Sequence, residues 1–178
     1  MIAFTRAHTY LSQLNTELLG LSVDSNSSHL AWMYDIYCKT GIKVSFPIIA
    51  DRNGEIARKY GMISSDISNT ETVRNVYIID DKGVIRTILI YPMNIGRFIP
   101  EIIRIVQALQ MADCAEGATA ANWIPNQPVI VPAPKTFEEL ENRVNYIREN
   151  RNGISWYLSF KEAPENCIIQ DCNNLMTE

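Results

Sequence analysis

The sequence has 178 residues, of which 47% are hydrophobic and 20% charged, a balance typical of one globular domain with an appendage. The formal net charge of −4 argues against nucleic acid or an anionic membrane as a partner. We find no apolar run of membrane-spanning length and no signal peptide, and the four cysteines then predict a reducing cytoplasm.

The first part of the chain alternates helical and strand signals. Apolar spacing predicts an amphipathic helix over residues 1–14, followed by a short buried strand over residues 18–23. Residues 25–28, three serines and Asn26, supply N-cap candidates for a helix that ends at Gly41. A second strand is predicted over residues 46–50, and a short helix over residues 53–60.

A strand with Arg74 at its head begins a predicted hairpin. Residues 76–80 and 84–91 are the two strands, Asp81-Lys82-Gly83 is the turn, and a helix over residues 97–111 closes the core. A guanidinium at the edge of a sheet is costly to desolvate unless an anion lies opposite it. Arg74 is therefore predicted to form the electrostatic half of an active site. The alternative is a surface ion pair with Glu71 or Asp80.

The composition changes after residue 112. Four prolines and the lone Trp123 predict an extended arm over residues 112–134, and Thr136 with Glu139 predicts the capped start of an exposed helix to about residue 150. The aromatic side chains of Trp123, Trp156 and Tyr157 are interpreted as anchors that pack against a second subunit. We therefore predict two domains, a core over residues 1–112 and an arm over residues 113–178.

This order of elements predicts an α/β, thioredoxin-like fold. In that layout a further strand, earlier in the chain, lies between the 18–23 strand and the Arg74 strand. Without it, the strands should form two separate pairs, 18–23 with 46–50 and 76–80 with 84–91. The alternative is that the two inner edges join into one sheet.

Several segments together resemble a peroxiredoxin of the long-tailed branch that groups one-cysteine and archaeal-type enzymes. The resemblance lies in LNTELLGLSVDSNSSHLAW (14–32), SFPIIAD (45–51), TVRNVYIIDDKGVIR (72–86), YPMNIGR (91–97) and ANWIPN (121–126). It implies a thiol peroxidase that reduces hydrogen peroxide and organic hydroperoxides, takes electrons from a thioredoxin-type thiol donor, and assembles as a homo-oligomer through the arm. It also implies that Arg74 is the active-site arginine and that Arg97 supports it.

The sequence departs from this family at the nucleophile. The family's peroxidatic cysteine lies in a Pro-x-x-x-Thr/Ser-x-x-Cys loop just before the helix that begins here at Met1, and the chain contains no such pattern. Gly153 and Ser159 occupy the positions of two tail cysteines of the archaeal-type enzymes. We therefore expect a thioredoxin-like core truncated at its N-terminus and inactive alone. A non-catalytic subunit that associates with full-length peroxiredoxins is the alternative.

The cysteines that are present offer a third hypothesis. Cys38 lies near the end of a predicted helix, where the helix dipole disfavours a thiolate, and Cys114 is expected to be structural or incidental. The spacing of Cys167 and Cys172 suits a reversible disulfide, and hence a redox-sensing module.

No metal site or cofactor is expected. His8 and His29 are the only histidines, and they fall on different predicted helices without a companion pair of cysteines. His29, close to the start of its helix, is interpreted as a capping or hydrogen-bonded structural residue.

Overall fold

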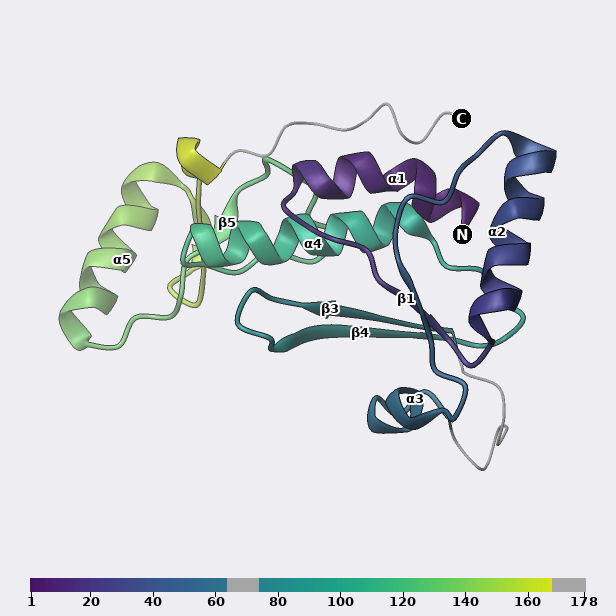
Figure 1. Ribbon diagram of the computed structural model, residues 1–178. Helices are drawn as coiled ribbons and strands as arrows, with labels where there is room; N and C mark the ends of the chain where they lie inside the picture. The colour runs from purple at the N-terminus through teal and green to yellow at the C-terminus, as the bar shows by residue number, and fades with distance from the viewer. Residues whose placement is uncertain (64–73, 168–178) are drawn as a thin grey trace. The chain divides into compact units, whose positions relative to one another are not determined.

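The computed structural model describes residues 1–63 and 74–167. The chain forms two compact units, Met1–Ile99 and Pro100–Glu178 (Figure 1). The second half of the last long helix packs with residues that follow it, including Trp123 and Val129. The predicted division into a core over residues 1–112 and an arm over residues 113–178 stays a prediction.

The N-terminal unit follows the predicted order of elements. It contains α1 (Ile2–Gln13), β1 (Gly20–Ser22), α2 (Asn26–Thr40), β2 (Ile48–Ala50), α3 (Glu55–Lys59), β3 (Arg74–Ile79) and β4 (Ile85–Tyr91). The hydroxyl of Ser25 accepts a hydrogen bond from the backbone N–H of Ser28 at the start of α2, and the helix ends at Gly41 with a φ of 71°. Both local signals therefore act as predicted, because a side-chain cap begins the helix and a left-handed glycine ends it.

The strands of this unit form two separate sheets within the described residues. β1 and β2 are parallel, with Gly20 opposite Ile48 and Ser22 opposite Ala50. β3 and β4 are antiparallel, and Arg74 lies opposite Tyr91. The predicted pairing is confirmed, and the alternative of one joined sheet is not observed.

The C-terminal unit is built around the end of a long helix. It contains α4 (Ile99–Cys114), which starts at the last residue of the other unit, followed by β5 (Val129–Ile130), α5 (Phe137–Asn150), β6 (Gly153–Ser155), β7 (Leu158–Lys161) and the 3₁₀ helix η1 (Glu165–Cys167). The strands form one antiparallel sheet in the order β5-β7-β6. Its hydrophobic cluster consists of Ala108, Met111, Ala115, Trp123, Val129 and Cys167.

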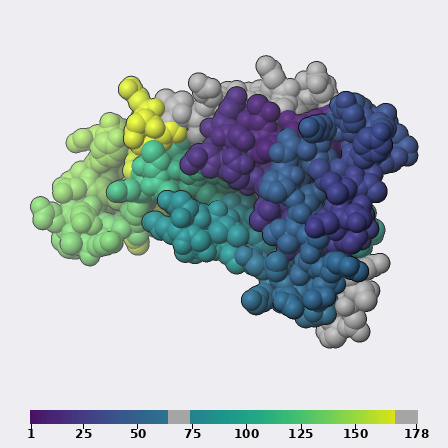
Figure 2. Space-filling model, in the orientation of Figure 1, coloured from purple at the N-terminus to yellow at the C-terminus, as the bar shows by residue number. Residues whose placement is uncertain are grey.

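The predicted exposed helix is confirmed. The Thr136 hydroxyl caps α5 by accepting from the Glu139 N–H, while the Glu139 carboxylate accepts from the Lys135 N–H at 2.6 Å. No residue of α5 is buried, and its light-green atoms lie at the surface in Figure 2. No helix in the described part of the chain has the length and apolar composition needed to cross a membrane.

The role predicted for Trp123 is wrong. Its side chain is 1% exposed and packs in its own unit, where the indole N–H donates to the Gln127 carbonyl at 3.0 Å. The Trp123 carbonyl in turn accepts from Arg104 at 3.0 Å. Trp156 and Tyr157 remain 44% and 60% exposed, so of the three predicted anchors these two are available to a partner.

Candidate active site

Arg74 is the first residue of β3 and belongs to the terminal residue pair of the β3–β4 hairpin. It is opposite Tyr91, the final residue of β4, and it is partly buried. Side chains alternate along a strand, so Arg74 shares its face with Val76 and with Tyr91 of the neighbouring strand. The register of the hairpin therefore fixes which side of the sheet this cation occupies.

Arg97 joins Arg74 from the loop that follows β4. Its Nη2 donates to the carbonyl of Asn75 at 3.3 Å, which holds the Arg97 side chain against the start of β3. Burial lowers the pKa of Arg97, the positive charge of Arg74 lowers it further, and Tyr91 acts in the opposite direction. Neither arginine forms an ion pair with a carboxylate of the described residues. Two close cations without a counter-charge among the described residues favour an anionic partner.

The start of α1 contributes a further positive potential. Burial lowers the pKa of the Met1 amino group, and the charge of Arg97 lowers it further, so the two groups lie close together. α1 begins at Ile2, and the N-terminus of a helix carries a partial positive charge. The two arginines and this helix end therefore place positive charge in the same part of the unit.

The alternative for Arg74 was a surface ion pair with Asp80 or Glu71, and the structure tests only the first partner. Asp80 instead pairs with Arg86 at 3.4 Å, and its carboxylate accepts from the backbone N–H groups of Lys82 and Val84. These contacts, led by the hydrogen bond from Val84, lower the pKa of Asp80. The other proposed partner, Glu71, lies outside the described residues. The catalytic roles of Arg74 and Arg97 stay predictions.

A polar network at the end of β1 was only partly foreseen. The Ser22 hydroxyl donates to the Asp24 carboxylate at 2.8 Å and lies 2.7 Å from Nε2 of His29. Because the Ser22 proton is directed to Asp24, His29 must donate from Nε2. His29 is thus hydrogen-bonded, as predicted, and its structural role stays a prediction. Its other nitrogen, Nδ1, is buried and has no partner among the described residues.

His8 lies in a different network, with Nδ1 2.6 Å from the Ser45 hydroxyl and Nε2 3.6 Å from the Glu17 carboxylate. The described ranges contain no cluster of three or more histidine, cysteine, aspartate or glutamate side chains placed to hold a metal ion.

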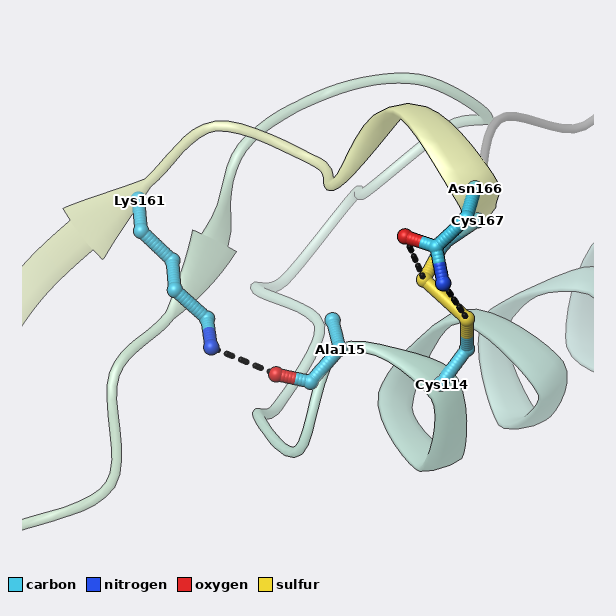
Figure 3. Close-up of a disulfide and its surroundings, with 5 residues drawn as sticks. All are labelled: Cys114, Ala115, Lys161, Asn166 and Cys167. Atoms are coloured by element: carbon cyan, nitrogen blue, oxygen red, sulfur yellow. Dashed lines mark hydrogen bonds between the residues drawn. A yellow bond between two sulfur atoms is a disulfide. The ribbon is translucent and has the colours of Figure 1, made fainter.

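The cysteine pair predicted from spacing is not the pair that forms. Cys167 is disulfide-bonded to Cys114, with 5.9 Å between the Cα atoms, and Cys172 lies outside the described residues. The chain after β7 turns back to the end of α4, which brings Cys167 to Cys114 (Figure 3). The two cysteines are 53 positions apart, so no short stretch of sequence signals this pairing. Cys38 is the free cysteine of the described residues and is exposed.

Known proteins resemble this chain over most of its length. The sequence matches the model of the AhpC/TSA family over residues 1–88 and that of the C-terminal domain of 1-Cys peroxiredoxin over residues 108–145. It is 51% identical to peroxiredoxin 2 of Caldanaerobacter subterraneus subsp. tengcongensis over 162 residues, which cover 91% of this chain and 73% of that protein. The chain belongs to the peroxiredoxin family.

Further relatives agree with this membership. The peroxiredoxin of Aquifex aeolicus is 44% identical over 172 residues, with 91% of this chain and 76% of that protein covered. The structure of a yeast mitochondrial 1-Cys peroxiredoxin matches with a TM-score of 0.74 at 31% identity, covering 90% of this chain and 76% of that one. Peroxiredoxin 6 of Arenicola marina matches with a TM-score of 0.74 at 27% identity and the same coverage. The predicted thioredoxin-like α/β class is confirmed.

Proposed function

We propose that this peroxiredoxin chain supplies the electrostatic half of a thiol peroxidase site that reduces hydrogen peroxide and organic hydroperoxides. The observation that carries the proposal is the position of Arg97, which donates to the Asn75 carbonyl beside Arg74 and lies near the N-terminal end of α1. A thiolate and a peroxide oxygen that leaves as an anion both need this kind of positive surrounding.

The reaction assigns a role to each group. A cysteine thiolate attacks one peroxide oxygen, the O–O bond breaks, and the departing hydroxide or alkoxide takes a proton, which leaves a sulfenic acid on the cysteine. Arg74 stabilises the thiolate and the departing oxygen, and Arg97 is held by the Asn75 carbonyl so that it supports Arg74. A thiol donor then condenses with the sulfenic acid and releases water. No cofactor takes part in these steps.

The sulfur nucleophile has to come from outside the given sequence. None of its four cysteines lies in a Pro-x-x-x-Thr/Ser-x-x-Cys pattern. We therefore propose that the 178-residue chain has no peroxidase activity alone. The nucleophile comes either from coding sequence upstream of Met1 or from a full-length subunit with which this chain associates. An in-frame or frameshifted codon run for the missing loop upstream of Met1 would support the first source and contradict the second.

A chimaera tests the site itself. Joining a Pro-x-x-x-Thr-x-x-Cys loop of the family, with the strands that precede it, ahead of Met1 should produce peroxide turnover with dithiothreitol, whereas the chain alone should match the reagent blank. In the active chimaera, Arg74→Gln should reduce kcat/KM by about a hundredfold or more, the cost of removing one donor from a developing anion. Arg86→Gln is the matched control, since Arg86 pairs with Asp80. Equal loss in both variants, or turnover by the chain alone, contradicts the proposal.

The remaining parts of the proposal concern partners and location. A thioredoxin-type protein is the proposed thiol donor, and a homo-oligomer formed through the C-terminal unit is the proposed assembly. A reducing cytoplasm is the proposed compartment, in keeping with catalysis that depends on a reduced thiol. The alternative of a redox-sensing module now involves Cys114 and Cys167, the pair that the structure joins.

A further inference from the structure

We propose that Cys114 and Cys167 form a redox-controlled latch, opened by a dithiol and closed by peroxide, which fixes residues 163–167 to the hydrophobic cluster of the C-terminal unit. The latch uses none of the residues of the proposed peroxidase site and does not depend on that function.

The two halves of the disulfide lie in different surroundings. Cys114 is the last residue of α4 and is exposed, whereas Cys167 is 7% exposed and belongs to the hydrophobic cluster with Met111 and Trp123. A thiolate from solution can therefore approach the sulfur of Cys114, and Cys167 is the leaving group. A disulfide with one accessible sulfur exchanges with external thiols, in contrast to one enclosed on both sides.

Few other contacts hold the end of the described chain. The Lys161 ammonium donates to the Ala115 carbonyl at 2.5 Å and fixes the end of β7 (Figure 3). After Lys161, the described residues reach the rest of the unit through the disulfide, through Asn166, and through apolar packing of Ala163 and Cys167. Because a segment with few contacts opens locally, breaking the cross-link should release residues 163–167.

Asn166 lies across the two sulfurs and distinguishes them. Its amide nitrogen lies 3.9 Å from the sulfur of Cys114, and its amide oxygen lies 3.8 Å from the sulfur of Cys167. A bonded sulfur carries no hydrogen, so the second contact becomes a hydrogen bond only after reduction, when the Cys167 thiol can donate. The amide thus presents its nitrogen to Cys114 and its oxygen to Cys167. The C-terminal end of α4 disfavours negative charge on the sulfur of Cys114, so closure should be slow for a peroxide-reactive cysteine.

Opening and closing each transfer two electrons. For opening, a thiolate of the dithiol attacks the Cys114 sulfur, the S–S bond breaks and Cys167 leaves as a thiolate that takes a proton. The second thiol then attacks the mixed disulfide and frees Cys114 as a thiolate, so the dithiol leaves as an intramolecular disulfide. For closing, the Cys114 thiolate attacks hydrogen peroxide, hydroxide leaves and becomes water, and Cys167 condenses with the sulfenic acid and releases a second water.

The test combines disulfide mapping with hydrogen exchange on the full chain. Mass spectrometry of the non-reduced, alkylated protein should find the peptide of Cys114 joined to that of Cys167. Reduction with dithiothreitol should speed amide exchange over residues 162–167 by about tenfold or more, as expected when a local opening replaces a constrained segment. Cys114→Ala should exchange at the reduced rate in both conditions. Cys38→Ser and Cys172→Ser are matched controls that should keep the response of the parent chain.

Three results would overturn the latch: a disulfide between Cys167 and Cys172, equal exchange before and after reduction, or loss of the response in Cys172→Ser. Should Cys114→Ala fail to fold, Cys167→Ala replaces it, because alanine retains a small apolar side chain in the cluster. Peroxide turnover is not a readout in this experiment, so its failure is separate from a failure of the proposed peroxidase function.

Discussion

Among individual residues, Asp80 shows how one carboxylate can organise a turn. Its backbone N–H donates to the Val84 carbonyl at 3.0 Å, its carboxylate accepts from the N–H groups of Lys82 and Val84, and Gly83 takes a φ of 76°. The turn Asp81-Lys82-Gly83 could be predicted because an aspartate before a glycine supplies both the acceptor and the left-handed backbone.

Asp80 also gives a prediction about pH. Its pKa is lowered from the ordinary 3.8, first by the hydrogen bond from Val84, so the ionised side chain stabilises the folded state at neutral pH. That contribution is lost as the pH falls through the lowered pKa of the folded state. Asp80→Asn should therefore unfold at a lower temperature than the parent chain at neutral pH, and the difference should shrink below pH 3.8.

Thermal unfolding followed by circular dichroism over a series of pH values measures this difference. Asp81→Asn, at the next position of the turn, is the matched control and should have the smaller effect at neutral pH. A difference between Asp80→Asn and the parent that stays constant down to acid pH would show that the charge of Asp80 is not responsible.

Among the elements, those with local signals were predictable and those built from distant partners were not. The cap at Ser25, the stop at Gly41 and the Thr136–Glu139 box each lie within a few residues of the helix end they define. β5, by contrast, contains two residues and pairs with β7, which follows it in the sequence only after α5 and β6. No short window of sequence therefore reveals this pairing. The burial of Trp123 and the pairing of Cys114 with Cys167 were missed for the same reason. The meeting of Arg74 with Arg97 was anticipated only through family resemblance.

The close pairing of β6 with β7 at Gly153 gives a prediction about stability. A Cβ on this residue would lie 2.7 Å from the Leu158 carbonyl oxygen and 2.8 Å from the Cα of Ser159, so β6 and β7 would have to separate. Gly153→Ala should lower the free energy of unfolding by about 1–3 kcal/mol, the usual cost of forcing atoms into a packed contact. Gly96→Ala is the matched control, because its Cβ would meet no atom within 4 Å.

Urea unfolding of both glycine variants measures the effect, and equal stability of Gly153→Ala and Gly96→Ala would contradict it.

The contact between Gly153 and Ser159 also involves two positions that were compared with tail cysteines of the family. By resemblance, Gly153 and Ser159 stand where archaeal-type enzymes have tail cysteines, and here they are directly opposite one another in the register of β6 and β7.

For the whole molecule, the disulfide gives a prediction about stability. A cross-link between residues separated by 53 positions removes chain entropy from the unfolded state worth about 4 kcal/mol, and measured values are usually about 2–4 kcal/mol. The oxidised chain should therefore unfold at a higher urea concentration than the reduced chain. A Cys114→Ala/Cys167→Ala double variant should unfold alike with and without dithiothreitol. Any remaining effect of dithiothreitol on that variant would have to come from Cys38 or Cys172.

Assembly is the second prediction for the whole molecule. The rings of Trp156 and Tyr157 pack edge to face 5.7 Å apart, and they remain largely exposed between β6 and β7. If they bury against a second subunit, Trp156→Ser with Tyr157→Ser should shift the mass measured by light scattering toward that of the monomer. Phe137→Ser is the control, since Phe137 is 73% exposed at the start of α5. An unchanged mass in the double variant would place the interface elsewhere.

The division of the N-terminal unit into two small sheets has a practical consequence for handling the protein. Within the described residues, β1 pairs only with β2 and β3 only with β4, so each strand keeps one side on which its amide and carbonyl groups have no strand neighbour. Such borders attract strands from other chains. Recovery of the purified polypeptide should consequently decline as it is concentrated, and dilute refolding should give more monodisperse material than refolding at high protein concentration.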